Sequence, residues 1–328
     1  MSATTLKAEV GKLPRVYSTM PYEIPGGGKA NVNYAVSGPE GGAPIMLIHG
    51  FGASINHWRY NEPFLTGLGY RVVRLDLLGF GASDKPPPEG EFDYNMELFE
   101  DVTLKVIEHV EGTGEVKVEG GVGGGWIVGG NSIGGLTALM VGRTLKKRCR
   151  GVVLFNTSGG MTSFRYEELP LLLRPILWFV QNMIRKYGNG FWENFKKPEN
   201  VEQILRDQVY PDNRNVNQEL LDIILEPSYD KGAREVFLAV FGGEAGPTPE
   251  DIIGQYSEGS KILALWGTGD LWTPLDNGLH PGSKLGDFAK EGVEYELVRL
   301  EGAGHCPHDE APELCHQALG PWLERLQG

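Results

Sequence analysis

A serine flanked by glycines stands where an apolar run gives way to a helix-forming run. The apolar residues 126–128 lead into Gly130-Asn131-Ser132-Ile133-Gly134-Gly135, which predicts a strand, a tight turn and a helix. A serine at the apex of such a turn has a strained backbone and needs small neighbours, which Gly130 and Gly134 supply. The pattern favours Ser132 as a nucleophile. Because 47 of the 328 residues are glycine, an ordinary turn with an incidental serine is the alternative.

Two further residues complete a set that could activate this serine. Asp270 follows the apolar run 261–266, and His305 follows the run 294–300. The carboxyl ends of parallel strands meet at one edge of a sheet, so Ser132, Asp270 and His305 can converge there. His305 would take the proton of Ser132, and Asp270 would orient the imidazole and stabilise its charged form. Taken singly, Asp270 could be a turn residue and His305 could bind its own loop.

Three other polar residues compete for these roles. His308 lies farther from its strand than His305 and is followed by a predicted helix, which Asp309 is expected to cap. His49 ends an earlier strand and is interpreted as a histidine that shapes its loop, not as a base. Asp76 is interpreted as the organiser of the glycine-rich loop that follows the next strand.

Strand-like and helix-like segments alternate over most of the chain, which predicts a mostly parallel sheet with right-handed crossovers. The first strand is expected to be antiparallel, and residues 115–125 are expected to form an exposed hairpin or loop. The expected strands are residues 31–37, 45–48, 70–76, 126–128, 151–155, 261–266 and 294–300, and the expected helices outside the cap are 94–110, 136–145 and 311–326.

The alternation is lost between residues 160 and 255, which predicts a helical cap over the active site. Its expected helices are residues 169–185, 198–209, 218–225 and 232–240. The segment 169–180 is unusually apolar but too short to span a bilayer. We expect Leu172, Ile176 and Phe179 to contact a lipophilic substrate, and packing on the core is the alternative. The domains are then an arm (1–29), a core of sheet and helices (30–159 and 256–328) and the cap (160–255).

The amino-acid composition limits the classes of partner that the protein is expected to bind. A net charge of −13 and a pI near 5.1, without a basic patch, argue against nucleic acid. Peripheral contact with a membrane stays open, as does the oligomeric state.

Cys149, Cys306 and Cys315 are widely separated, so neither a disulfide framework nor a zinc site is indicated, and a reducing compartment fits best. No metal or cofactor is expected. Residues 1–19 lack the apolar segment of a secretory signal and are either a transit-peptide remnant or a disordered arm.

Five stretches carry a resemblance to a known family: residues 49–54 (HGFGAS), 57–61 (HWRYN), 76–81 (DLLGFG), 130–135 (GNSIGG) and 302–310 (GAGHCPHDE). With them the chain resembles the α/β-hydrolases and, more narrowly, the plastid and cyanobacterial group that contains chlorophyll dephytylase and pheophytinase. The resemblance implies an α/β-hydrolase fold, with a mostly parallel sheet, helices on both faces and a cap inserted after the sixth strand.

The same resemblance implies roles for particular residues. Ser132, Asp270 and His305 would be the catalytic triad, and the backbone N–H groups of Phe51 and Ile133 would form the oxyanion hole. The implied reaction is hydrolysis of the phytyl ester of chlorophyll or pheophytin without a cofactor. The implied location is the chloroplast, in the stroma or at the thylakoid surface, with the cytoplasm as the alternative.

Three functions stay open on the sequence alone. The first is hydrolysis of a carboxylic ester of a lipophilic or other small apolar substrate. The second is hydrolysis of a C–C bond, for which the triad would look the same. The third is a non-catalytic ligand receptor, a class that often loses a triad member. A haloalkane or epoxide hydrolase is disfavoured, since those enzymes carry a carboxylate where Ser132 stands.

Overall fold

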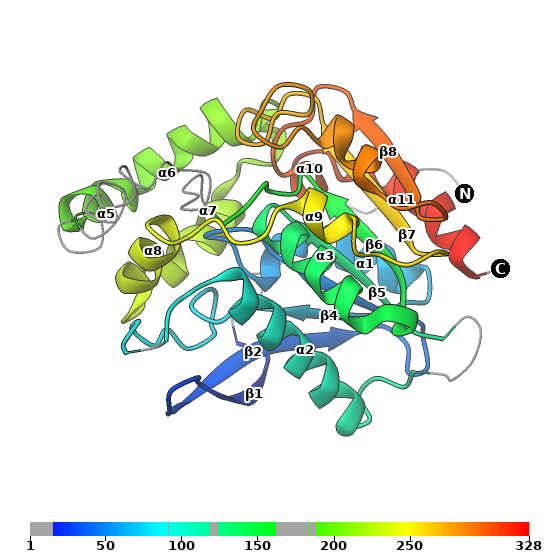
Figure 1. Ribbon diagram of the computed structural model, residues 1–328. Coiled ribbons are helices and arrows are strands. Elements are labelled where there is room, and N and C mark those ends of the chain that lie inside the picture. Colours follow the sequence, from blue (N-terminus) through cyan, green and yellow to red (C-terminus); the bar gives the residue numbers. More distant parts are fainter. Residues whose placement is uncertain (1–15, 91, 119–123, 162–182, 184–187, 328) are drawn as a thin grey trace, which may run out of the picture.

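The computed structural model describes residues 16–90, 92–118, 124–161, 183 and 188–327. These residues form an eight-stranded sheet in the order β1-β2-β4-β3-β5-β6-β7-β8 (Figure 1). β2 pairs antiparallel with both β1 and β4, and every later pair is parallel. The strands are β1 (Ser18–Glu23), β2 (Lys29–Ser37), β3 (Pro44–Ile48), β4 (Arg71–Leu75), β5 (Trp126–Asn131), β6 (Cys149–Phe155), β7 (Lys261–Gly267) and β8 (Glu294–Leu300).

The register of the parallel strands places four connecting segments at one edge of the sheet. Ile48 of β3 is opposite Gly130 of β5, so the loop after β3 leaves the sheet beside the turn after β5. Gly267 of β7 is opposite Leu300 of β8, so the segments that carry Asp270 and His305 leave together. β3 and β5 are buried along their whole length, as central strands covered on both faces should be.

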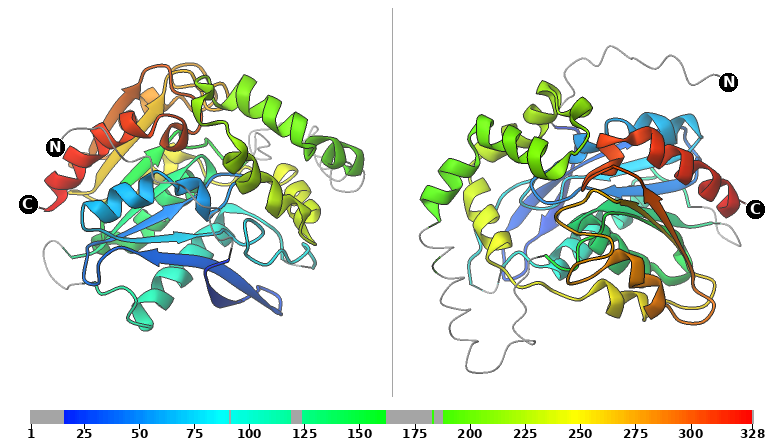
Figure 2. Two further views of the ribbon diagram at one scale, coloured as in Figure 1. Left: turned by 180° about the vertical axis from the view of Figure 1, so that it is seen from behind. Right: turned by 90° about the horizontal axis from the view of Figure 1, so that it is seen from above.

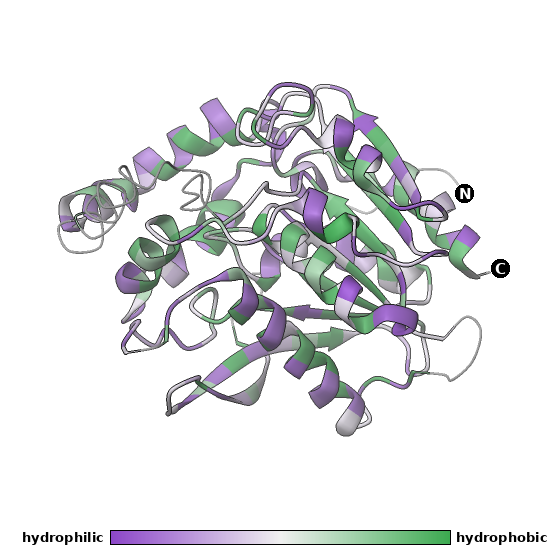
Figure 3. Ribbon diagram, in the orientation of Figure 1, coloured by the Kyte–Doolittle hydropathy of each residue, from purple (hydrophilic) through white to green (hydrophobic). Residues whose placement is uncertain are grey.

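Helices cover both faces of the sheet (Figure 2). One face carries α2 (Met96–Gly112), α3 (Ile133–Leu145) and α9 (Pro249–Ile253), and the other carries α1 (Asn61–Gly67) and α11 (Pro312–Gln327). The apolar residues of α2 at helical spacing are buried, as their period predicts. Hydropathy colouring shows apolar residues along the central strands and α3, and polar residues on the outside of α2 (Figure 3). The predicted fold class is confirmed.

Short helical turns connect these elements: η1 (Ile55–Trp58), η2 (Lys146–Arg148), η6 (Gly282–Phe288) and α10 (Pro307–Glu310).

The cap follows β6, as predicted, and lies beside the carboxyl ends of the strands (Figure 1). Its described elements are α5 (Asn189–Phe195), α6 (Pro198–Ile204), η3 (Leu205–Val209, a π-turn), η4 (Asn213–Asn215), α7 (Gln218–Leu225), η5 (Glu226–Tyr229) and α8 (Ala233–Phe241). The expected helix 169–185 and the substrate contacts Leu172, Ile176 and Phe179 lie outside the described residues. None of the described helices combines the length and apolar character needed to cross a bilayer.

Two segments differ from the expected domain boundaries. Residues 18–23, expected in an arm, form β1, because Met20 and Tyr22 alternate inward and are buried in the main core. α9, expected in the cap, packs on α3 of the core, because Ile252 and Ile253 join the same core cluster. Short segments of this kind carry too little periodicity to be assigned from sequence.

Candidate active site

Ser132 occupies the tight turn between β5 and α3. Its backbone has φ 56° and ψ −122°, a strained conformation for a residue with a side chain. The glycines on either side are required by space. A Cβ on Gly130 would lie 2.0 Å from the carbonyl oxygen of Gly134, and one on Gly134 would lie 2.2 Å from that of Ile48. The turn therefore presents the serine hydroxyl at the edge of the sheet, at the N-terminus of α3.

Asn131 fixes the turn to its neighbours. Its side-chain amide donates to the carbonyl oxygens of Phe155 at 3.0 Å and His305 at 2.9 Å. The N–H of Ser132 also donates to Phe155, at 3.1 Å. The residue before the serine thus links the turn directly to the loop that carries His305.

His305 and Asp270 form a hydrogen-bonded pair. Nδ1 of His305 lies 2.9 Å from Oδ2 of Asp270. A carboxylate only accepts, so the proton sits on Nδ1 and leaves Nε2 of the neutral ring as a base. Oδ1 of Asp270 accepts from the N–H groups of Trp272 at 2.7 Å and Thr273 at 3.0 Å, and Oδ2 accepts from the amide of Asn156 at 2.6 Å.

The environment of Asp270 keeps it ionised. Burial by itself would raise the pKa of its carboxyl. The facing imidazole of His305 and the hydrogen bonds from His305 and Thr273 outweigh burial and hold that pKa well below its ordinary value. The indole of Trp272 also stacks on the ring of His305, with centroids 5.8 Å apart. Asp270 is therefore an anion that orients the imidazole throughout the neutral range.

Ser132 and His305 line the same two cavities, together with Phe51 and Trp272. The loop after β3 runs beside the serine, since a Cβ on Gly50 would lie 3.2 Å from Cβ of Ser132. Within the described chain, neither the Phe51 N–H nor the Ile133 N–H donates to a protein acceptor. Two such donors beside a hydroxyl can receive a developing oxyanion, and Ile133 adds the positive end of the α3 dipole.

His49 and Asp76 hold loops, as interpreted from the sequence. Nδ1 of His49 donates to the carbonyl oxygen of Gly50 at 2.7 Å, and its Nε2 accepts from the N–H of Leu77 at 3.0 Å. Burial lowers the pKa of His49, although Asp76 opposes the shift. Asp76 accepts from the N–H groups of Ile55 at 2.6 Å and Ala82 at 2.7 Å. Asp76 also accepts from the side-chain amide of Asn33 at 2.7 Å, so both side chains are engaged in holding loops.

Asp309 does not cap a helix, which corrects the sequence expectation. Its carboxylate accepts from Nε of Arg59 at 2.7 Å and from the hydroxyl of Tyr210 at 3.0 Å. His57 joins this network, with Nε2 2.7 Å from the same hydroxyl, and burial lowers its pKa to about 4. His308 is fully buried against the ring of Trp58. Neither His308 nor Asp309 lines the two cavities.

Sequence reasoning missed two sets of residues. Trp272 and Thr273 donate to the carboxylate of Asp270. The role of Thr273 could have been predicted from the sequence, because it is a hydroxyl residue three positions after an aspartate that follows a strand. Arg59, His57 and Tyr210 link the core to the cap, but their partners are distant in sequence. No local pattern would have paired them.

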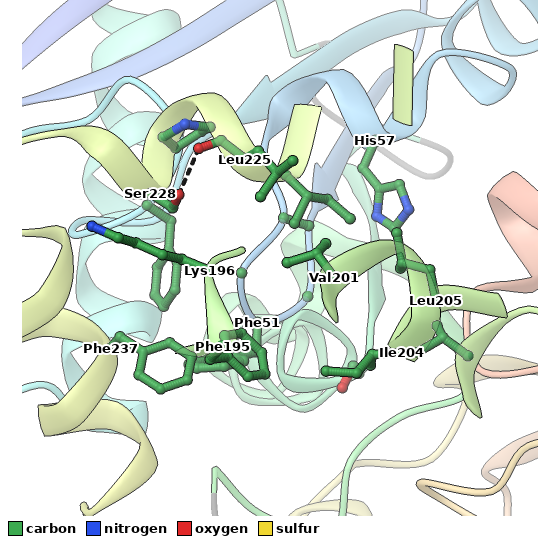
Figure 4. Close-up of a pocket in the computed structure, with 18 of the residues that line it drawn as sticks. Phe51, His57, Phe195, Lys196, Val201, Ile204, Leu205, Leu225, Ser228 and Phe237 are labelled. Carbon is green, nitrogen blue, oxygen red and sulfur yellow. Dashed lines mark hydrogen bonds between the residues drawn. The ribbon is translucent and has the colours of Figure 1, made fainter. Parts of the chain in front are cut away.

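An apolar cavity lies under the cap, and Ser132 is among the residues that line it. Figure 4 shows part of its wall. Its wall comes from the cap elements, from the loops after β3 and β4, and from the segments that carry Trp272 and His305. Two lysines lie on this wall, and both are paired: Lys85 is 2.9 Å from Asp230 and Lys196 is 3.0 Å from Glu193. The apolar lining residues include Phe51, Phe195, Val201, Ile204, Leu205, Ile224, Leu225 and Phe237. The cavity suits an uncharged hydrocarbon group. The described residues contain no cluster of side chains that could hold a metal ion.

Comparisons place these features among known proteins. Residues 45–318 match the model of the alpha/beta hydrolase family. The chain is 26% identical over 293 residues to the dihydrolipoyllysine-residue acetyltransferase component of the acetoin cleaving system of Pseudomonas putida, which is 88% of this chain and 65% of that protein. It is 27% identical over 340 residues to chloroplastic pheophytinase of Arabidopsis thaliana, which is 91% of this chain and 65% of that protein.

The chain thus spans about 65% of the length of these two curated relatives. Among solved structures, the meta-cleavage product hydrolase from Pseudomonas fluorescens IP01 superposes with a TM-score of 0.68 at 21% identity. The superposition covers 95% of this chain and 98% of that one, and it demonstrates a shared fold.

Proposed function

The chain belongs to the alpha/beta hydrolase family, and from this we propose that it is a serine hydrolase that cleaves a carboxylic ester bearing a long apolar group. One observation carries the proposal. Ser132, on a strained turn, shares its cavities with His305, whose Nδ1 lies 2.9 Å from the buried carboxylate of Asp270. These are the contacts that a serine hydrolase needs to activate its nucleophile.

The proposed reaction proceeds in two steps. Nε2 of His305 takes the proton of Ser132 as Oγ attacks the ester carbonyl carbon, and the N–H groups of Phe51 and Ile133 stabilise the oxyanion. The C–O bond to the alcohol breaks, and the alcohol leaves with the proton from His305. A water molecule, deprotonated by His305, then attacks the acyl carbonyl carbon. The bond from that carbon to Oγ breaks, the carboxylic acid leaves, and His305 returns the proton to Ser132. Asp270 stabilises the imidazolium in both steps.

The apolar cavity supports a lipophilic substrate class. Its wall offers hydrocarbon contacts, and its two lysines are already paired, which favours an uncharged, lipophilic ester. Burying apolar surface stabilises a complex by roughly 25 cal/mol per Å², so a long isoprenoid chain would gain several kcal/mol. The phytyl ester of chlorophyll or pheophytin is the substrate we propose, in a chloroplast, and the similarity to pheophytinase supports it.

Incubation with chlorophyll a and pheophytin a, with chromatography for free phytol, tests this substrate. p-Nitrophenyl acetate and laurate serve as general ester probes, and a vinylogous 1,5-diketone tests C–C cleavage. Ser132→Ala protein is the control for each. We expect phytol release and laurate hydrolysis that Ser132→Ala loses. Hydrolysis of laurate without phytol release would support an esterase but rule out the phytyl ester as its substrate. Cleavage of the diketone alone would replace the ester proposal.

A further inference from the structure

The loop that carries His305 lies directly against the cap. We call residues 302–306 the histidine loop and residues 209–212, between η3 and η4, the cap linker. The N–H of His305 donates to the carbonyl oxygen of Val209 at 3.0 Å. A Cβ on Gly304 would lie 2.3 Å from the same oxygen, so the two segments are in close contact. The position of His305 therefore depends on the cap linker.

One buried carboxylate binds both segments. Oε1 of Glu310 accepts from the N–H of Asp212 in the cap linker at 2.7 Å, and Oε2 accepts from the N–H of Gly304 in the histidine loop. The Glu310 side chain is fully buried, and it lines neither of the two cavities beside Ser132. It therefore binds the residue next to His305 and the cap without contacting a molecule in either cavity.

Only the ionised form of Glu310 can accept fully from both N–H groups. A carboxylate has two accepting oxygens, whereas protonation turns one of them into a donor. Burial raises the pKa of Glu310 to about 7, and the two N–H groups oppose the rise without cancelling it. The carboxylates of Asp212 and Asp270 raise this pKa further. The protein therefore holds, close to His305, an acid that gains or loses its proton near neutral pH.

The other titratable groups around Glu310 are paired or neutral. Arg214, on the cap side, is bound to Asp212, with its Nε 2.6 Å from Oδ2. The thiols of Cys306 and Cys315 lie on the core side, and burial raises the pKa of each well above its ordinary value, so both stay neutral. A proton taken up at this contact near neutral pH therefore belongs to Glu310.

We propose that Glu310 is a positioning residue, which holds the histidine loop against the cap linker only while its carboxylate is ionised. This inference rests on the proposed function. When Glu310 takes up a proton, the N–H of Gly304 or of Asp212 loses its acceptor, and the histidine loop is held at fewer points. A base displaced by a fraction of an ångström from its nucleophile acts more slowly, by roughly tenfold or more. Hydrolysis is thereby favoured as the pH rises through about 7.

Glu310→Gln tests this inference, because glutamine has the shape of the protonated acid and cannot ionise. kcat for p-nitrophenyl laurate is compared between wild type and variant from about pH 5.5 to about pH 8.5, with released laurate measured by chromatography. The ratio of wild type to variant should rise from near one at the acid end to about tenfold at the alkaline end. The titration of His305 is common to both proteins and cancels in the ratio. KM should change less than about twofold, since Glu310 lines neither cavity.

A ratio that is the same at every pH would overturn the inference, whether it is near one or well above it. Packing alone would give the second result, because packing does not titrate. Glu313 is exposed on α11, and Glu313→Gln is the matched control, which should follow the wild type throughout. Urea unfolding at each pH confirms that kcat is compared between folded proteins.

Nuclear magnetic resonance separates this inference from the proposed function, because it needs no turnover. The backbone N–H resonance of Asp212 should shift with pH, with a midpoint at about 7, in the wild type and not in Glu310→Gln. At about pH 8.5 the Nδ1–H resonance of His305 should differ between the two proteins, since the histidine loop is held differently. An Asp212 resonance that does not titrate near pH 7, or identical His305 resonances, would overturn the inference. Both expected differences without ester hydrolysis by the wild type would count against the proposed function alone.

Discussion

Arg59 binds the carboxylate of Asp309 through two hydrogen bonds, from Nε to Oδ1 at 2.7 Å and from Nη2 to Oδ2 at 3.0 Å. The hydroxyl of Tyr210, at the end of a cap segment, donates to the same carboxylate. Asp309 is thereby engaged in joining the cap to the core. Asp270 is left as the carboxylate that faces His305, although Asp309 is closer to His305 in sequence.

The first prediction separates these two aspartates. Asp270→Asn should lower kcat by roughly 10⁴, because the imidazole loses its anion and adopts the wrong tautomer, with little change in stability. Asp309→Asn should instead lower the free energy of unfolding by about 2 kcal/mol, since buried Arg59 loses the carboxylate that accepts two of its hydrogen bonds and keeps only Glu219 as a counter-charge. Steady-state kinetics and urea unfolding of both variants measure this. If Asp309→Asn were stable but inactive while Asp270→Asn stayed active, Asp309 would be the catalytic acid and Asp270 would not.

The fold and the triad candidates could be predicted because their signals are local. The turn around Ser132 needs glycines at fixed neighbouring positions, and both stand within two residues of it. β8 was expected at residues 294–300 and has these bounds, because its apolar positions recur with a strand's period. Asp270 and His305 directly follow predicted strands, so the parallel order of the sheet was enough to bring them together.

The remaining features depend on contacts that the sequence does not display. Arg59 and Asp309 are 250 positions apart, and nothing near either residue indicates the pairing. Without that partner, the position of Asp309 before a helix favoured a capping role. His280 stands in a loop without regular structure, so its contact with Glu250 could be found only from the fold. Leu172, Ile176 and Phe179 stay predicted substrate contacts.

The second prediction concerns the apolar cavity. Ile204→Asn and Ile224→Asn each remove hydrocarbon surface from its cap wall. At roughly 25 cal/mol per Å², a long chain should lose more binding than a short one. We expect kcat/KM for p-nitrophenyl laurate to fall about tenfold or more, and that for the acetate only a few-fold. Leu314→Asn, on the exposed side of α11, is the matched control. Equal losses on both esters would assign the two isoleucines to packing.

The third prediction concerns pH and His316, which stacks on Phe64 with ring centroids 3.9 Å apart. Burial lowers the pKa of His316 to about 4, so the folded protein binds its proton less readily than the unfolded chain does. Its contribution to stability is present above pH 6.5 and is lost as the pH falls toward 4. His316→Phe keeps the stacking and removes the titration. The variant should gain stability relative to the wild type between pH 6.5 and 4 in urea unfolding. A difference that does not change with pH would contradict this.

The central claim is that Ser132 is the nucleophile, and covalent labelling tests it most directly. A fluorophosphonate reacts with a serine only where a base and an oxyanion hole activate it. Peptide mass spectrometry of the labelled protein should show a single adduct, on the peptide that contains Ser132. Ser132→Ala should abolish both the adduct and ester hydrolysis, with a loss in kcat of roughly 10⁴ or more. An adduct on another serine, or a Ser132→Ala protein that keeps more than about a tenth of wild-type activity, would contradict the account.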